Sequence, residues 1–281
     1  MAAISASSAW HEITSASNAR LKLVKKIHAR RQREKLGLVL LEGHRLVLDA
    51  FDAGLRPEFV VLHDGALSHP SGNRLEEALS SMDADNVLRA PEHLVASLSD
   101  TKTPQGVLAV FPQPQLDLPA SPSLILVCDG ISDPGNLGTL LRSAAGAGVS
   151  GAILTPGCSD PWGLKALRSG MGAQCRLPVR QLSWEETSAQ LDAWGCAAYG
   201  ADAAGSIAHY QVDWQSRAAL IVGSEAHGLS DEVRADASVA LCRIPLGSVT
   251  ESDGEGLESL NAAVAGSIIL FEAQRQRRLT Q

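Results

Sequence analysis

Polar residues of catalytic type stand among glycines in the stretch DGISDPGNLGTLLRSA, residues 129–144. Three glycines in this stretch let another chain or a ligand approach the backbone closely. Asn136 offers an amide, and Arg142 offers a guanidinium that stays protonated in proteins. The two are six residues apart, so on one regular helix they would not share a face, but they could converge if Asn136 lies in the loop before the helix. For Asn136 taken alone, a helix N-cap is the favoured interpretation.

A second polar stretch, ALIVGSEAHGLS at residues 219–230, places Glu225 directly after an apolar run. In open α/β sheets, ligands bind outside the carboxyl ends of the strands, so Glu225 is a candidate site residue. The competing interpretation is a carboxylate that is stabilised by the dipole at a helix start. This stretch alone supports both equally.

A third stretch, residues 243–268, joins a strand to the last helix through a loop rich in glycine, serine and acidic residues. The strand ends at Ile244, and Ser259 and Asn261 fall in the first turn of the expected helix. Their side chains would either cap that helix or form hydrogen bonds with a ligand. For this stretch alone, capping is the simpler interpretation.

Strands and helices alternate on both sides of the proline-rich segment PQPQLDLPASPS. We therefore expect a small α/β domain at residues 1–111, a linker at 112–123 and a second α/β domain at 124–281. Glycine-rich strand ends of the second domain would then meet in one pocket. In the last helix, apolar residues recur every three or four positions, which predicts one apolar face: Leu260, Val264, Ile268 and Phe271.

The segment GAGVSG, residues 146–151, matches the spelling G-x-G-x-x-G of a dinucleotide-binding turn. Such a turn must follow a strand and open a helix. Here the segment closes a helix expected at 133–148 and precedes the strand GAILT. We therefore interpret its glycines as a helix C-cap and a tight turn, and we reject a Rossmann nucleotide site.

Charge is distributed unevenly along the chain. The net charge of the whole chain is −7, which by itself argues against nucleic-acid binding. Between residues 18 and 45, however, nine Lys and Arg residues face only two Glu residues. A basic arm on an acidic body is typical of a region that meets phosphates, although a solvated surface helix is the alternative. The candidate RNA-binding residues are Arg20, Lys22, Lys25, Lys26, Arg30, Arg31 and Arg33.

The spacing of the cysteines and histidines indicates the redox compartment and whether the chain binds a metal. The five cysteines contain no C-x-x-C, and the eight histidines contain no H-x-x-x-H pair. These patterns predict a reducing compartment and no metal site. No apolar window reaches the length of a membrane span, and the start of the chain does not resemble a secretory signal. We expect a cytoplasmic protein, with an organellar matrix or stroma as the alternative.

Taken together and in this order, the three polar stretches resemble the motifs of the SpoU (TrmH-type) branch of the SPOUT methyltransferases. The first motif has the form N-x-G-x-x-x-R-(S/T)-A, the second is a strand followed by G-x-E-x-x-G, and the third is I-P…S-L-N. The basic N-terminal segment resembles the accessory RNA-binding domain of that branch. The matching residues are Asn136, Gly138, Arg142, Ser143 and Ala144, then Gly223, Glu225 and Gly228, then Ile244, Pro245, Ser259, Leu260 and Asn261.

This resemblance implies a C-terminal α/β domain with a trefoil knot, preceded by a small ribosomal-protein-like α/β domain that binds RNA. It also implies a homodimer that transfers a methyl group from S-adenosylmethionine to a ribose 2′-hydroxyl of structured RNA, most of all ribosomal RNA. The cofactor-binding residues that it implies are Thr155, Gly223, Ile244, Leu246 and Leu260.

The resemblance assigns the catalytic roles as well. Arg142 would act on the ribose hydroxyl, and because arginine stays protonated we expect it to stabilise the alkoxide rather than to accept the proton. Asn136 and Asn261 would orient the ribose or the arginine, and Glu225 would fix that network. Ser259 would hold the target nucleotide or the cofactor loop.

Two alternatives and one departure from the family pattern stay open at this point. The substrate could be transfer RNA, or the protein could be a knotted RNA-binding or assembly factor without catalysis. The loop of residues 246–258 is longer than is usual and carries four acidic residues. It could be disordered without ligand, or it could exclude some RNAs.

Overall fold

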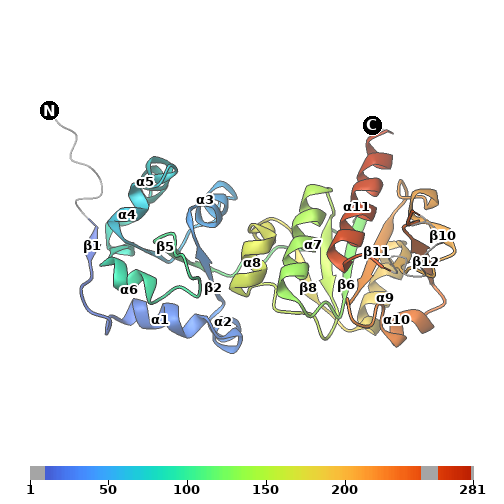
Figure 1. Ribbon diagram of the computed structural model, residues 1–281, viewed down its shortest axis with the longest axis horizontal. Helices are drawn as coiled ribbons and strands as arrows, with labels where there is room; N and C mark the ends of the chain where they lie inside the picture. The colour runs from blue at the N-terminus through green and yellow to red at the C-terminus, as the bar shows by residue number, and fades with distance from the viewer. Residues whose placement is uncertain (1–9, 248–258, 280–281) are drawn as a thin grey trace, which may run out of the picture. The chain divides into compact units, whose positions relative to one another are not determined.

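The computed structural model describes residues 10–247 and 259–279, which form two units (Figure 1). The first unit contains the chain up to Pro114 together with the segment Trp162–Cys175. The second contains Gln115–Pro161 and Arg176–Gln281. No helix in the described ranges is long and apolar enough to cross a membrane. The long acidic loop discussed above falls almost entirely at residues 248–258, outside the described residues.

The first unit is built on a mixed sheet with the strand order β1-β4-β3-β5-β2. Strands β1, β4 and β3 are parallel, whereas β5 runs antiparallel to both β3 and β2. The bounds of the strands are β1 (His11–Glu12), β2 (Leu38–Glu42), β3 (Phe59–Leu62), β4 (Val87–Arg89) and β5 (Val107–Pro112).

Helices cover both faces of this sheet, because successive strand residues point to opposite sides and both sets are apolar. One face packs against α3, α4 and α5, and the other packs against α1 and α6. The bounds of the helices are α1 (Ala19–Ile27), α2 (Arg30–Leu36), α3 (His44–Asp52), α4 (Asp64–Leu67), α5 (Gly72–Ser80), α6 (Glu92–Ala96) and α8 (Leu164–Gly170), with short 3₁₀ turns at Ala84–Asn86 and Ala173–Cys175.

The second unit is a parallel α/β sheet with the strand order β10-β12-β9-β11-β6-β7-β8. Its central strands are fully buried, as expected where helices cover both faces of a parallel sheet. The bounds are β6 (Leu124–Asp129), β7 (Gly151–Leu154), β8 (Val179–Gln181), β9 (Ala197–Ala201), β10 (Ile207–Ala208), β11 (Ala218–Gly223) and β12 (Val239–Arg243).

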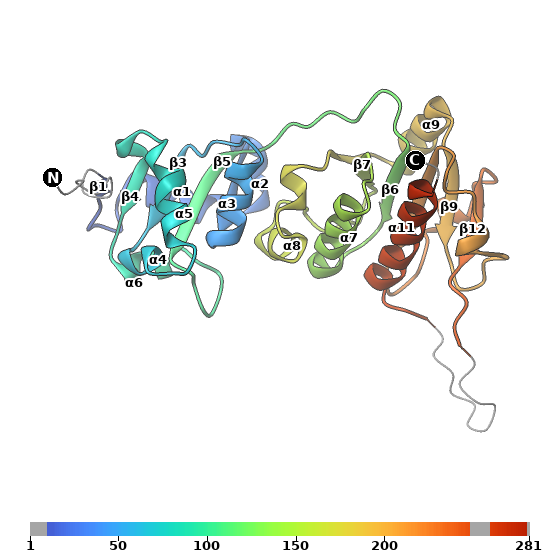
Figure 2. The ribbon, with the colours of Figure 1, turned by 90° about the horizontal axis from the view of Figure 1, so that it is seen from above.

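One face of this sheet packs against α7 and α11, which lie side by side in both ribbon views (Figures 1 and 2). The other face packs against α9 and α10. Gly266 permits the close approach of α11, because a Cβ there would lie 2.5 Å from Leu140 Cδ2 on α7. The bounds are α7 (Pro134–Gly146), α9 (Trp184–Trp194), α10 (Asp231–Ala235) and α11 (Ala262–Arg278), with a 3₁₀ turn at His209–Gln211.

The α/β class predicted from the sequence is confirmed. The segment at 146–151 also behaves as predicted, since α7 ends at Gly146, Gly148 has a φ of 73° and β7 begins at Gly151. Parallel strands β9, β11, β6 and β7 end at the same edge of the second sheet. The polar stretches that follow β6, β11 and β12 are therefore brought toward one another.

Candidate active site

The N-terminus of α7 is capped by Asp133 rather than by Asn136. The Asp133 carboxylate accepts a hydrogen bond from the Asn136 backbone N–H at 2.9 Å, and Pro134 occupies the first helical turn. The interpretation of Asn136 as an N-cap is therefore wrong. Because the cap is supplied three residues earlier, the Asn136 side chain is available for other contacts.

The Asn136 side chain links two segments that are distant in sequence. Its Nδ2 donates a hydrogen bond to Glu225 Oε1, and its Oδ1 accepts one from Asn261 Nδ2 at 3.2 Å. The amide thus uses its donor end on one partner and its acceptor end on the other. We call this set of three residues the Asn–Glu–Asn network.

Glu225 belongs to a tight turn at the end of β11. Ser224 and Gly228 exchange two backbone hydrogen bonds of 2.9 Å, which closes the turn around Glu225. Helix α10 begins only at Asp231, and its N-cap is Ser230. The interpretation of Glu225 as a helix-start carboxylate is therefore wrong, because the turn holds it at the strand end instead.

Asn261 has two functions at once. Its Oδ1 accepts hydrogen bonds from the backbone N–H groups of Ala263 and Val264, at 2.9 and 3.2 Å, so it caps α11. Its Nδ2 remains for Asn136. Capping and site formation were alternatives on the sequence, but the two ends of one amide satisfy both. The helix starts at Ala262, and Ser259 lies before it.

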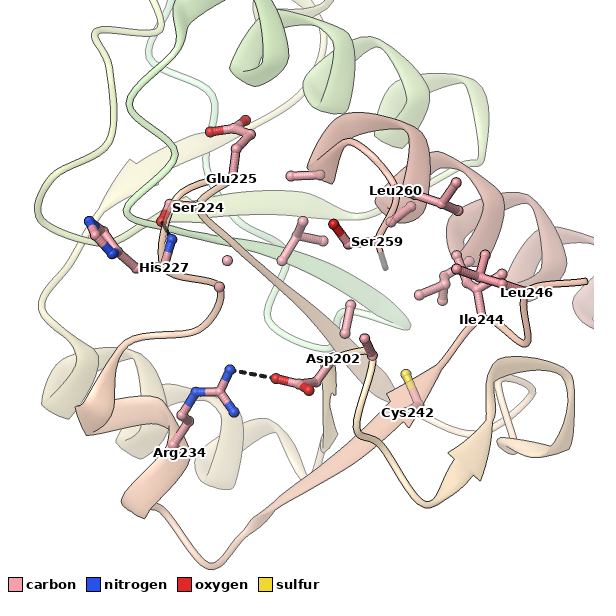
Figure 3. Close-up of a pocket in the computed structure, with 18 residues that line it drawn as sticks. Asp202, Ser224, Glu225, His227, Arg234, Cys242, Ile244, Leu246, Ser259 and Leu260 are labelled. Carbon is pink, nitrogen blue, oxygen red and sulfur yellow. Dashed lines mark hydrogen bonds and ion pairs between the residues drawn. The ribbon is translucent and has the colours of Figure 1, made fainter. Parts of the chain in front are cut away.

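A cavity of about 340 Å³ has Glu225 of the network in its wall (Figure 3). Gly223 lies in its wall with no room for a side chain, since a Cβ there would be 2.2 Å from the Gly228 backbone. Burial raises the pKa of Cys242 to about 12, so this residue lines the cavity as a neutral thiol. Of the predicted residues, the cavity wall contains Gly223, Glu225, Ile244, Leu246, Ser259 and Leu260.

The cavity wall has an apolar side and a polar side (Figure 3). Ile244, Leu246 and Leu260 gather on the apolar side. Glu225, Asp202 and Arg234 are charged groups of the wall, and the last two were not among the predicted site residues. Asp202 follows the apolar strand β9 just as Glu225 follows β11, so the same strand-end rule could have found it.

Arg142 is not part of the Asn–Glu–Asn network. It is exposed on α7, and no hydrogen bond among the described residues joins it to that network. It lies six residues beyond Asn136 within one regular helix, which puts its Cα about 9 Å further along the axis. The structure therefore brings Asn136, Glu225 and Asn261 together within one chain, but it leaves Arg142 apart from them.

Residues 123–271 of the chain, which include this site, match the SpoU rRNA Methylase family. The chain belongs to this family. Residues 18–109 match the MRM3-like substrate binding domain. The family resemblance predicted from the motifs is thus confirmed.

Relatives of this SpoU chain extend over almost its whole length. It is 32% identical to the mitochondrial rRNA methyltransferase 3 of Mus musculus, over 90% of this chain and 71% of the mouse protein. It is 30% identical to the 23S rRNA (guanosine(2553)-2′-O)-methyltransferase RlmP of Bacillus subtilis, over 92% and 98% of the two chains. The AdoMet-bound rRNA methyltransferase of Sinorhizobium meliloti superposes with a TM-score of 0.78, at 30% identity over 95% and 98%.

Thr155 lies outside the cavity wall of this SpoU chain. It is buried, and its hydroxyl donates a hydrogen bond to Asp129 Oδ1 at 2.9 Å while it accepts one from the Gly130 backbone. The other oxygen of Asp129 accepts a hydrogen bond from the backbone of Ser230. Its hydroxyl thus ties the end of β7 to the end of β6, and its contact with the cofactor stays a prediction.

The seven candidate RNA-binding residues of the substrate-binding domain lie on two helices, α1 and α2. Lys22, Lys25, Lys26, Arg30 and Arg31 are exposed on them, although Arg30 forms an ion pair with Glu34. These side chains remain candidates for contact with RNA.

Two arginines of the arm are used inside the protein. Arg33 is buried, and its guanidinium donates hydrogen bonds to the carbonyls of Ile27 and His28 at the end of α1. Arg20 donates to Asn86 and lies over the Phe59 ring. Both arginines therefore stabilise the fold of this unit, and their contact with RNA stays a prediction.

Proposed function

We propose that this protein transfers a methyl group from S-adenosylmethionine to a ribose 2′-hydroxyl of ribosomal RNA. The observation that carries the proposal is the position of Glu225, which lines the cavity and also accepts a hydrogen bond from Asn136. A bound cofactor and a polar network would therefore meet at one residue. The names of the relatives support ribosomal RNA and the ribose 2′-oxygen as the target.

The cavity suits a cofactor that is partly aromatic and partly charged. Ile244, Leu246 and Leu260 offer apolar surface for an adenine ring, and Gly223 places the end of β11 in the same cavity wall. Glu225 adds a carboxylate that can face a positive charge. When it is bound, S-adenosylmethionine supplies an electrophilic methyl group attached to a sulfonium. A solved relative from Sinorhizobium meliloti binds this cofactor.

The chain's own residues must position the ribose and manage one proton. A ribose hydroxyl is a poor nucleophile until its proton leaves or the developing oxyanion is stabilised. We assign the stabilisation to Arg142, because a guanidinium stays charged at neutral pH. Asn136 and Asn261 would orient the ribose, and Glu225 would hold Asn136 in place. Ser259, exposed before α11, would contact the target nucleotide.

The separation of Arg142 from the network favours a homodimer. Val264, Ile268 and Phe271 form an apolar stripe on α11, with 48%, 38% and 48% of their surfaces exposed. Phe271 lies against Gly146 of α7, and Arg142 shares the exposed face of α7 with Gly146, four residues further along. A second copy packed on this stripe would bury it and bring Arg142 to the interface.

The remaining assignments concern the parts of the chain and its compartment. We assign RNA binding to the N-terminal region at 1–111, with 112–123 as linker and 124–281 as the methyltransferase region that contains the trefoil knot. The exposed basic residues of α1 and α2 support the first assignment. Five free cysteines support a reducing compartment, either the cytoplasm or an organellar matrix.

A transfer assay with purified protein tests this proposal. The protein is incubated with methyl-labelled S-adenosylmethionine and either ribosomal or transfer RNA, and the RNA is then hydrolysed with alkali. A 2′-O-methyl group blocks cleavage of the adjacent phosphodiester, so we expect the label in alkali-resistant dinucleotides from ribosomal RNA. Label on a base would refute the ribose assignment, and label in transfer RNA alone would favour the alternative substrate. Absence of label and of cofactor binding would favour a silent RNA-binding factor.

A further inference from the structure

Asp202 and Arg234 form an ion pair in the wall of the cavity (Figure 3). The Arg234 guanidinium lies 2.5 Å from Asp202 Oδ2. Only 10% of the Asp202 side chain is exposed, against 40% of the Arg234 side chain. The pair contacts none of the three residues of the Asn–Glu–Asn network through a hydrogen bond of the described residues, so the mechanism above does not use it.

The Asp202 carboxylate is held in place by one donor on each of its oxygens, and these donors occupy about half of its acceptor sites. Its backbone N–H donates to the Cys242 carbonyl at 2.9 Å, which pins the end of β9 to β12. Its Oδ1 accepts a hydrogen bond from the Ala204 backbone at 2.8 Å, and its Oδ2 faces Arg234. A carboxylate has about four acceptor sites, so the residues that the structure describes leave about two of them for a ligand.

Arg234 fixes the orientation of that carboxylate. Its Nε donates to the Leu229 carbonyl at 3.1 Å, and its Nη2 would lie 3.1 Å from a Cβ at Gly228. The guanidinium therefore connects the turn after β11 with the acid after β9. This contact fixes the Asp202 carboxylate in the cavity wall.

We propose that Asp202 accepts hydrogen bonds from the ribose hydroxyls of the adenosine cofactor, with Arg234 as its positioning residue. This inference rests on the proposed function, because it takes the cavity to be the cofactor site. An acidic side chain near a strand end is a well-suited acceptor for a ribose hydroxyl, as in nucleotide-binding α/β proteins of another fold. Apolar residues for the adenine line the same cavity, so base and ribose would lie side by side in it.

Removing one ribose hydroxyl from the ligand tests this without altering the protein. The affinities of the full chain for S-adenosylhomocysteine and for its 2′-deoxy and 3′-deoxy forms are measured by calorimetry. For wild type, we expect at least one deoxy form to bind more weakly by on the order of ten- to hundredfold, because a hydrogen bond to a carboxylate is lost. Losses of less than about twofold for both deoxy forms would overturn the proposal.

Variants then locate the effect at Asp202. In Asp202→Asn, the preference for the intact ribose should shrink to a few-fold at most, while the deoxy form binds about as well as it does to wild type. Asp192→Asn is the matched control, because it removes the same charge from an exposed position of α9 and should keep the full preference. An unchanged preference in a folded Asp202→Asn protein would contradict the assignment.

Arg234 is tested by conservative replacement. Arg234→Ala should reduce the ribose preference, and Arg234→Lys should restore part of it, because a lysine can still pair with the carboxylate. A purely structural role would instead change the affinity for intact and deoxy ligands equally. Failure of wild type to bind S-adenosylhomocysteine at all would refute the proposed cofactor, which is a different result from binding without ribose preference.

Discussion

Replacing Asn136 by alanine should separate catalysis from folding and from cofactor binding. The substitution removes two hydrogen bonds, one to the Glu225 carboxylate and one from Asn261. A bond to a charged group contributes about 1.5–3 kcal/mol and a neutral one about 0.5–1.5 kcal/mol. Glu225 and Asn261 are both exposed, so water replaces most of these bonds in the free protein. We therefore expect the free energy of unfolding to change by less than about 1 kcal/mol.

The same bonds should matter far more when RNA covers the site and excludes water. If about 2 kcal/mol of their combined energy is needed to hold the transition state, the methyl-transfer rate should fall by about thirtyfold. A single-turnover assay at saturating RNA measures this rate, while calorimetry measures the affinity for S-adenosylhomocysteine. Thr139→Ala is the matched control, since it lies one turn along α7 with its hydroxyl bonded to the Gly135 carbonyl. A rate within threefold of wild type would refute the assigned role of the network.

Four further predictions follow from individual residues. Arg142→Ala should abolish methyl transfer while the melting temperature stays the same; measurable turnover would remove it from the catalytic set. Phe271→Glu should shift the protein toward monomers in analytical ultracentrifugation, since a charge would sit in the apolar stripe, and an unchanged mass would exclude that face as the interface. Reversing charge at Lys25 and Lys26 should weaken RNA binding and flatten its dependence on salt, which filter binding at several salt concentrations would show. Burial lowers the pKa of His44 in the folded protein, so the unfolded chain binds a proton at this residue at a higher pH than the folded chain does. The free energy of unfolding should therefore fall as the pH drops below about 6.5, and His44→Gln should lessen this loss in melting curves measured at several pH values.

The longer elements of the fold were predictable because their apolar residues recur with clear periods. Strands β6, β7, β9, β11 and β12 and the final helix all follow such runs. Strands β1, β4 and β10 were missed, since two or three residues carry no detectable alternation. The break between α1 and α2 could not be predicted, because the buried Arg33 stabilises it and Arg33 is indistinguishable in the sequence from the exposed basic residues around it.

The sequence predicted that the site residues follow the ends of strands, but it did not predict the hydrogen bonds between their side chains. Sequence order placed Asn136, Glu225 and Asn261 after separate strands, and parallel packing then brought their side chains together. The sequence could not show that Asp133 supplies the cap that frees Asn136, since either residue type can cap a helix. The strand-end rule could have found Asp202, but its pairing with Arg234 joins positions 32 residues apart and left no trace in the sequence.

The central claim is that one pocket presents a ribose 2′-oxygen of ribosomal RNA to a cofactor methyl group. A map of 2′-O-methyl groups on total RNA, from cells with and without the protein, tests this claim most directly. We predict that at least one ribosomal nucleotide loses its 2′-O-methyl group, and that wild type restores it whereas Asn136→Ala restores much less. Identical maps of ribosomal RNA in the two kinds of cell would contradict the account.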